Sequence, residues 1–125
     1  MTANGDKQGY YACGFYGYQD TLYAKSGKQY YSNSYIEGAT DYIFGNAAAW
    51  FGECTIANKG GGPITATSRT TNSEATWYVF DHSTVSLTTT FNFDQFLTMY
   101  RSLQYLALIW LEKAISVALG GSTLV

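Results

Sequence analysis

Residues 31–36 read YSNSYI, and the same pattern occurs three more times in the first 86 residues. An aromatic residue is followed three positions later by Cys or Ser, and five positions later by an apolar residue. The other copies are YYACGF at 10–15, FGECTI at 51–56 and FDHSTV at 80–85. Successive copies lie 21, 20 and 29 residues apart, and a period in this range is typical of stacked supersecondary units.

The pattern favours strands separated by turns. In each copy the Cys or Ser and the apolar residue lie two positions apart, so we expect them to share the inward face of one strand. The stretches between copies contain the turn sequences KSGK, NKGGGP and TTNSEA. Together these features predict an all-β chain, a right-handed parallel β-helix of about four coils, with residues 58–75 as a longer loop. An antiparallel meander is the alternative on pattern alone.

The two cysteines fall on equivalent positions of this pattern. Cys13 and Cys54 would lie two coils apart, and coils stack at ~4.8 Å, so their Cα atoms would be roughly 10 Å apart. That separation exceeds the reach of a disulfide. We therefore expect two free, buried thiols that pack as small apolar residues.

The repeat ends near residue 86. Residues 95–119 have helix-favouring composition, and Gly120 and Gly121 would end that helix. Charged residues in the middle of the apolar run 103–119 argue against a membrane span, so we expect the helix to pack against the last coil. The predicted organisation is a β-helix domain over 1–86 and a divergent, helical tail over 87–125.

Composition excludes several classes of function. The net charge of −2 and the scattered Lys and Arg residues argue against a nucleic-acid partner. His82 is the only histidine, and there is no CxxC or GxSxG motif, which argues against a histidine-rich metal site and a serine hydrolase elbow. We interpret His82 as structural. No signal peptide follows Met1, so either the chain is cytosolic or its true N-terminus is missing.

Two aspartates stand out in segments that are otherwise apolar and aromatic. Asp20 and Asp41 are 21 residues apart, which places them at equivalent positions on neighbouring coils. Two carboxylates this close do not both ionise freely, which would leave one acid and one base or nucleophile. Gln19 could donate its amide hydrogens to a developing oxyanion. The alternatives are aspartates that serve turns and an ordinary surface glutamine.

Aromatic residues follow both aspartates at the same distance. Tyr23 and Phe44 each lie three residues after an aspartate, so they too should stack. Rings beside paired carboxylates suit packing against sugars, and core packing is the alternative. Glu37 is expected to face solvent or to pair with a lysine.

Two segments carry a family resemblance. GYQDTLY at residues 17–23 and IEGATDYIFGNA at residues 36–47 resemble the two signature segments of the pectin methylesterase (pectinesterase) family. The resemblance covers residues 4 to about 86 and is closest to the fungal branch. It implies a right-handed parallel β-helix that needs no metal or cofactor.

The resemblance also implies roles for individual residues. Asp41 would be the nucleophile that attacks the methyl ester of galacturonate, Asp20 the acid and base, and Gln19 the oxyanion donor. Thr40, Tyr23 and Phe44 match positions that line the pectin-binding cleft. The implied substrate is methyl-esterified pectin, handled by a secreted, monomeric enzyme without nucleic-acid or membrane partners.

The chain departs from the family pattern in one important respect. The family has a Leu-Gly-Arg-Pro-Trp segment after the strand that resembles YVFDHSTV, and its arginine orients the nucleophile. No such segment is present, and neither Arg69 nor Arg101 stands in a matching context. We therefore expect a truncated family member with weak or no activity. The alternatives are a non-catalytic pectin-binding β-helix and a structural domain with a hydrophobic tail.

Overall fold

The computed structural model describes residues 1–88, which form twelve strands and no helix. The first sheet contains β1 (Thr2–Asn4), β4 (Leu22–Ser26), β7 (Ile43–Phe44) and β10 (Thr65–Ala66). The second contains β2 (Gln8–Tyr11), β5 (Lys28–Ser32), β8 (Ala48–Gly52) and β11 (Trp77–Asp81). The third contains β3 (Gly14–Tyr16), β6 (Tyr35–Gly38), β9 (Thr55–Asn58) and β12 (Thr84–Leu87).

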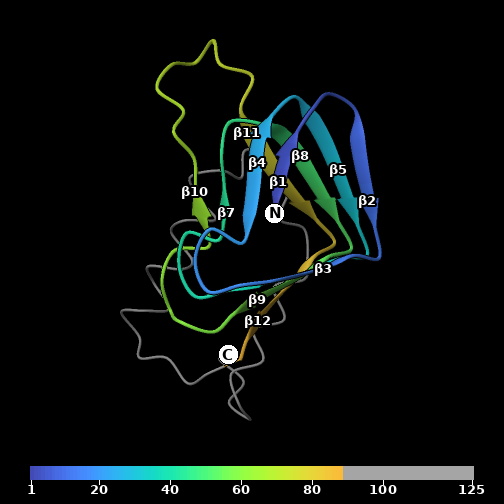
Figure 1. Cartoon of the computed structure of the whole chain (residues 1–125), viewed down its shortest axis with the longest axis vertical. Coiled ribbons are helices and arrows are strands. Elements are labelled where there is room, and N and C mark those ends of the chain that lie inside the picture. The colour runs from blue at the N-terminus through green and yellow to red at the C-terminus, as the bar shows by residue number, and fades with distance from the viewer. Residues whose placement is uncertain (89–125) are drawn as a thin grey trace.

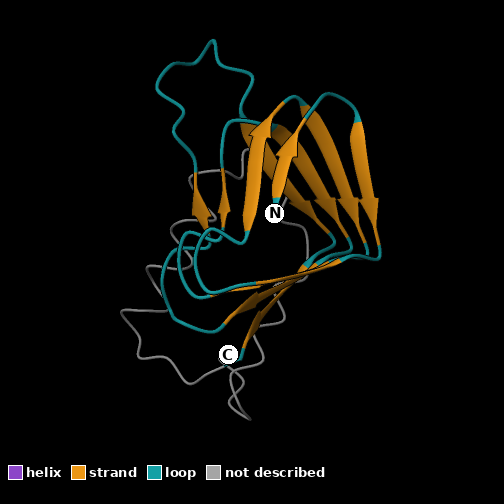
Figure 2. Cartoon of the chain, in the orientation of Figure 1, coloured by secondary structure: helices purple, strands orange, loops and turns teal. Residues whose placement is uncertain are grey.

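Each coil gives one strand to each sheet, and every strand pair is parallel. Figure 1 shows the chain passing from the first sheet to the second and then to the third before the order repeats. Figure 2 shows that loops alone connect the strands. The predicted right-handed parallel β-helix is confirmed, and the antiparallel meander is excluded for the part of the chain described.

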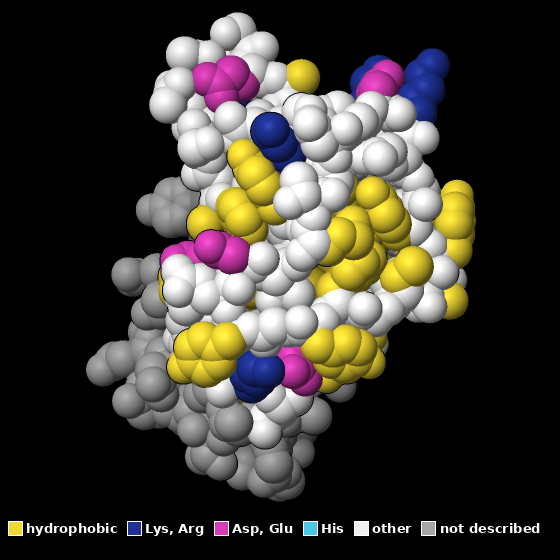
Figure 3. Space-filling model, in the orientation of Figure 1, with side chains coloured by type: hydrophobic (Ala, Val, Ile, Leu, Met, Phe, Trp, Pro, Cys, Tyr) yellow, Lys and Arg dark blue, Asp and Glu magenta, His cyan; other side chains and the backbone are white. Residues whose placement is uncertain are grey.

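The repeated aromatic residue forms a ladder inside the coils. Stacked rings of Tyr10, Tyr31, Phe51 and Phe80 have centroid distances of 4.9, 4.8 and 4.8 Å along the series. These residues pair in register on the second sheet. Tyr10 and Phe15 pack against the buried core. Figure 3 shows a cluster of hydrophobic side chains on the face of the molecule turned toward the viewer.

The Cys or Ser of each repeat does not lie inside a strand, which corrects our expectation. Cys13, Ser34, Cys54 and Ser83 immediately precede the third-sheet strands, at the corner between two sheets. The residue before each has left-handed backbone, with φ between 47° and 53° at Ala12, Asn33, Glu53 and His82. Left-handed backbone is uncommon outside glycine, so the sharp corner that it makes is a specific feature of every coil. The apolar residue therefore belongs to a different sheet from the aromatic residue.

The corner residues hydrogen-bond between neighbouring coils, from a backbone N–H group to a serine hydroxyl. The Cys13 N–H donates to Ser34 Oγ at 3.2 Å, and the Cys54 N–H donates to Ser83 Oγ at 3.0 Å. Both cysteines are free, as predicted. Cys54 lies between two corners and is buried, and burial raises the pKa of its thiol. Cys13 is only half-buried, which corrects the prediction, because within residues 1–88 it has a neighbouring corner on one side alone.

The longer last repeat has two extended loops instead of the single loop predicted over 58–75. The connection from β9 to β10 spans residues 59–64, where the preceding coil uses 39–42. The connection from β10 to β11 spans 67–76, where the preceding coil uses 45–47. Within the second loop Arg69 donates hydrogen bonds to the carbonyls of Thr71, Asn72 and Thr76.

Among residues 1–88, no helix is long and apolar enough to span a membrane. The helix predicted over residues 95–119 and its packing on the last coil lie outside the described residues.

Candidate active site

The two aspartates lie side by side on neighbouring coils, just before β4 and β7. Gln19 forms a parallel bridge with Thr40, and Leu22 pairs with Ile43. Between these pairs, the Asp20 N–H donates to the Asp41 carbonyl at 3.4 Å. The 21-residue spacing therefore brings together four residues at the N-terminal ends of the central strands β4 and β7: Gln19, Asp20, Thr40 and Asp41.

Both aspartates have left-handed backbone, with φ of 56° at Asp20 and 46° at Asp41. Aspartate is among the few residues that adopt this conformation readily. Asp20 is exposed and Asp41 is half-buried. Within residues 1–88 no side chain hydrogen-bonds or ion-pairs with either carboxylate. The left-handed backbone also fits the turn role that we considered for both aspartates.

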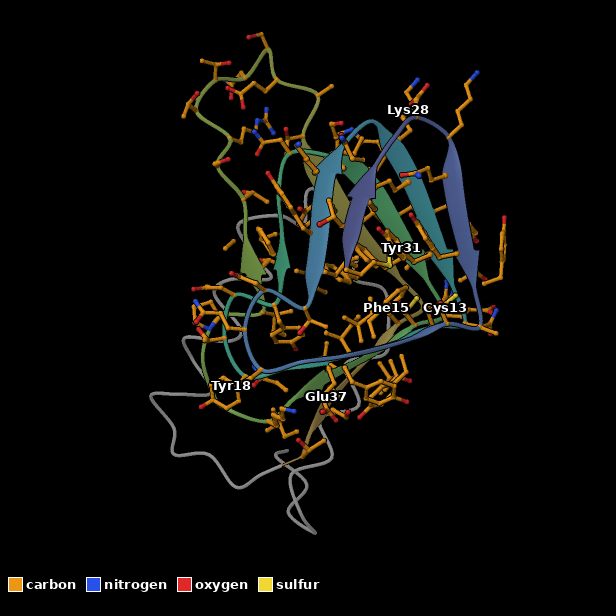
Figure 4. The ribbon with its side chains drawn as sticks, viewed as in Figure 1. Cys13, Phe15, Tyr18, Lys28, Tyr31 and Glu37 are labelled. Atoms are coloured by element: carbon orange, nitrogen blue, oxygen red, sulfur yellow. The ribbon has the colours of Figure 1, made fainter. Side chains whose placement is uncertain are left out.

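The backbone on both sides of the aspartate pair is firmly held. The Tyr18 carbonyl accepts the N–H groups of Ala39 and Thr40, at 2.6 and 3.3 Å. Figure 4 shows Tyr18 in the connection that leads into β4. On the other side, the Asp41 N–H donates to the Pro63 carbonyl at 2.6 Å. The Asp41 turn is therefore supported from the coil before it and the coil after it.

Asn58, which the sequence analysis did not single out, shapes the supporting loop. Its side chain is fully buried. Its Oδ1 accepts the N–H groups of Gly60 and Gly61, both at 3.0 Å, and its Nδ2 donates to the Gly62 carbonyl at 3.0 Å. The available signal was an asparagine that ends a strand before the glycines of NKGGGP.

Gly62 packs directly against the site. A Cβ at this position would lie 2.5 Å from both Cβ and Oγ1 of Thr40, closer than non-bonded atoms can approach. Only glycine lets the loop come this near. Asn58 and Gly62 thus set where Thr40 and Asp41 sit.

Tyr23 and Phe44 pair on the central strands β4 and β7 of the first sheet, and their rings stack. Their ring centroids are 4.5 Å apart and the rings are within 5° of parallel. Tyr23 is half-buried and lies between the fully buried Leu22 and Ala24, so its ring points outward. The Tyr78 hydroxyl donates to the Gly45 carbonyl at 2.9 Å and so fixes the residue after Phe44. The stack is therefore half-buried on the outward side of the first sheet.

Two other candidates serve structure. The Glu37 carboxylate bonds Lys59 Nζ at 2.8 Å and the Tyr35 hydroxyl at 2.9 Å, and the lysine first, then the tyrosine, lowers the Glu37 pKa. The expected lysine pair is thus confirmed, and Figure 4 places Glu37 on the third sheet. His82 occupies a corner, and its exposed ring lies 2.7 Å from an Asp81 oxygen. Within residues 1–88 no three metal-binding side chains come together.

Comparison with known proteins identifies the family of this chain. The pectinesterase family model matches residues 1–119. The chain belongs to the pectinesterase family. The match extends beyond residue 86, where the sequence analysis placed the end of the resemblance. The division of the chain at that residue stays a prediction.

Fungal pectinesterases are among the relatives of this pectinesterase family member. It is 66% identical over 85 residues to a probable pectinesterase A of Neosartorya fischeri and 64% identical over 85 residues to pectinesterase A of Emericella nidulans. Each alignment covers 68% of this chain and 26% of the relative, so the chain spans about a quarter of those proteins.

Solved structures share the fold. The pectin methylesterase of Aspergillus niger superposes with a TM-score of 0.68 at 55% identity, over 70% of this chain and 29% of that structure. The pectin methylesterase from carrot superposes with a TM-score of 0.62 at 36% identity, over 66% of this chain and 28% of that structure.

Proposed function

We propose that the chain is part of a pectin methylesterase and hydrolyses methyl esters of galacturonate in pectin, with Asp41 as the nucleophile. The supporting observation is the pairing of Asp20 and Asp41 on neighbouring coils, beside the Tyr23–Phe44 stack, in a member of the pectinesterase family. An extracellular location and a monomeric state belong to the same proposal.

In the first half-reaction an Asp41 oxygen attacks the ester carbonyl carbon. The Gln19 amide donates a hydrogen bond to the oxyanion that forms. The bond from carbon to the methoxy oxygen then breaks, and Asp20 gives its proton to that oxygen, which leaves as methanol. The product is an acyl-enzyme, an anhydride between Asp41 and the sugar carboxyl group.

In the second half-reaction the Asp20 carboxylate takes a proton from water while the water oxygen attacks the sugar carbonyl. The anhydride bond breaks and the Asp41 carboxylate is released. The polymer leaves with one galacturonic acid unit in place of its methyl ester. Asp20 is again protonated, so atoms and protons balance over the cycle. Thr40, Tyr23 and Phe44 would line the cleft and hold the sugar rings.

We further propose that this reaction is slow in the chain as it stands. No arginine of residues 1–88 contacts the Asp41 carboxylate, since Arg69 is bonded to carbonyls of its own loop. A nucleophile without an orienting partner spends less time in a reactive geometry. The turn at Asp41 would still supply part of the orientation.

The second candidate, a pectin-binding β-helix without catalysis, is favoured only by the half-buried, outward-facing stack of Tyr23 and Phe44. Two assays on one preparation separate the candidates. Methanol release from highly methylated pectin, above a blank without protein, supports the esterase. Retardation of the chain in a gel that contains pectin, without methanol release, supports the binding protein. If the chain shows neither methanol release nor retardation, both candidate functions are contradicted.

A further inference from the structure

The outward face of the second sheet carries lysines and aromatic rings that the proposed reaction does not use. Side chains alternate along these strands, so Gln29 and Tyr31 of β5 are buried while Lys28 and Tyr30 face outward. We define the lysine–aromatic face as Lys7, Tyr11, Lys28, Tyr30 and Trp50. Figure 4 shows Lys28 at the start of β5, on a different sheet from the aspartate pair.

The three rings of this face are exposed but ordered by the sheet. The relative exposure is 67% for Tyr11, 41% for Tyr30 and 37% for Trp50. The Tyr11 ring lies over the backbone of Gly9, where a Cβ would be 2.9 Å from it, and its centroid is 6.1 Å from that of Tyr30. The Tyr11 and Tyr30 rings are tilted by 54° to each other. Exposed rings that are held in place by a sheet offer a preformed surface for the apolar faces of sugar rings.

Polar groups point toward the same place. The Tyr30 hydroxyl and the Trp50 indole nitrogen lie 3.1 and 3.6 Å from the position of a Cβ on Gly52. The Tyr30 and Trp50 side chains therefore converge over the buried Gly52 and bring one hydroxyl and one N–H group together. Such groups can bond the hydroxyls of a carbohydrate.

Beside the rings lies a hollow of about 280 Å³ that Lys7, Lys28, Tyr11 and Tyr30 help to line. Gln8 also lines it, and its Oε1 has no hydrogen-bond partner among the described residues. The nearest acidic residue along the chain, Asp6, accepts the Lys28 backbone N–H at 3.0 Å. Within residues 1–88 neither lysine ammonium forms an ion pair with a carboxylate. Two lysines and one aspartate therefore lie at this end of the second sheet, which gives a local net positive charge in a chain that is negative as a whole.

We propose that the lysine–aromatic face binds a de-esterified, anionic stretch of galacturonan, an inference that rests on the proposed function. Each hydrolysed ester leaves a carboxylate on its sugar, and the two lysines complement such carboxylates while the rings contact the sugar faces. The methylated substrate lacks that charge. The face therefore holds product segments on one sheet while the aspartate pair on another sheet acts on esters elsewhere along the polymer.

The test measures binding of polygalacturonate to the full chain carrying Asp41→Asn, through quenching of tryptophan fluorescence and by calorimetry. The double variant Lys7→Gln/Lys28→Gln should weaken binding about tenfold, because it removes two exposed ion pairs with the carboxylates of the polymer. Trp50→Ala should weaken it by a similar factor. Binding should fall with added salt and should be at least several-fold weaker for fully methyl-esterified pectin.

Two matched variants serve as controls. Lys25→Gln removes an exposed lysine from the first sheet, and Tyr16→Ala removes a tyrosine that is 70% exposed on the third sheet. Neither should change the dissociation constant by more than about twofold. Equal losses in control and test variants, equal binding of dextran sulfate, or no loss in the lysine double variant would each overturn the proposal.

The outcome is separable from that of the proposed function. Methanol release by the unsubstituted chain, together with lysine variants that bind normally, would leave the esterase standing and remove the lysine–aromatic face. Lysine-dependent polygalacturonate binding without methanol release would support the lysine–aromatic face and contradict the esterase.

Discussion

Replacing Asn58 with alanine tests whether a buried asparagine supports the candidate site. The side chain makes three hydrogen bonds of 3.0 Å, to Gly60, Gly61 and Gly62, and is fully buried. Each such bond contributes about 0.5–1.5 kcal/mol net, and the buried Gly61 N–H would be left without its acceptor. We expect Asn58→Ala to lower the free energy of unfolding by about 3 kcal/mol.

Urea unfolding followed by circular dichroism measures this loss. Asn72→Ala is the matched control, because Asn72 is exposed and its side chain makes no hydrogen bond within residues 1–88. The control should stay within about 0.5 kcal/mol of the parent chain. Hydrogen exchange of the Asp41 amide, which donates to Pro63, should also accelerate in Asn58→Ala. A loss below about 0.5 kcal/mol, with unchanged exchange at Asp41, would refute the role given to Asn58.

Three further predictions concern stability and reactivity. Tyr78→Phe should lower the free energy of unfolding by about 1–2 kcal/mol, because the Gly45 carbonyl loses its donor. Tyr42→Phe should leave the free energy of unfolding unchanged or raise it, because the buried Tyr42 hydroxyl has no hydrogen-bond partner among residues 1–88. Urea unfolding of both variants measures the difference, and equal losses would contradict this prediction. The Glu37 pKa is lowered below its ordinary 4.5 in the folded chain, so the Lys59 pair stabilises at neutral pH and this contribution disappears as the pH falls through the folded pKa. Glu37→Gln should therefore be less stable than the parent by about 0.5–1 kcal/mol at pH 7, and this difference should disappear as the pH falls through the folded pKa of Glu37. A pH-independent difference would argue against the pair. A thiol reagent should modify Cys13 in the folded chain and Cys54 only after unfolding, and equal rates at both would contradict the burial of Cys54.

Much of the fold follows from the sequence because a β-helix repeats its own contacts. The ring at residues 10, 31, 51 and 80 recurs since each coil stacks that ring on the next, so the period could be read without coordinates. The corner at Cys13, Ser34, Cys54 and Ser83 was misplaced because a spacing of two residues fits a strand as well as a sharp turn. The left-handed residue before each corner is Ala, Asn, Glu or His, so residue type gave no common signal.

The candidate site was predictable where it obeys the repeat and not where it depends on loops. The 21-residue spacing placed Asp20 beside Asp41 and Tyr23 on Phe44. The loop 59–64 has no counterpart of equal length in the coil before it, so the bonds of Asn58 and the approach of Gly62 to Thr40 could not be derived from periodicity. The exposed rings of the second sheet likewise follow from alternation along the strands, but their convergence over Gly52 required the structure.

The most direct test of the account compares methanol release from highly methylated pectin by the unsubstituted chain and by Asp41→Asn. Asp6→Asn serves as the control, since that carboxylate lies at the end of the second sheet and supports only the Lys28 turn. We predict slow release by the unsubstituted chain and by the control, and release at the level of the blank by Asp41→Asn. Release by Asp41→Asn at the rate of the unsubstituted chain would contradict the assignment of Asp41 as the nucleophile.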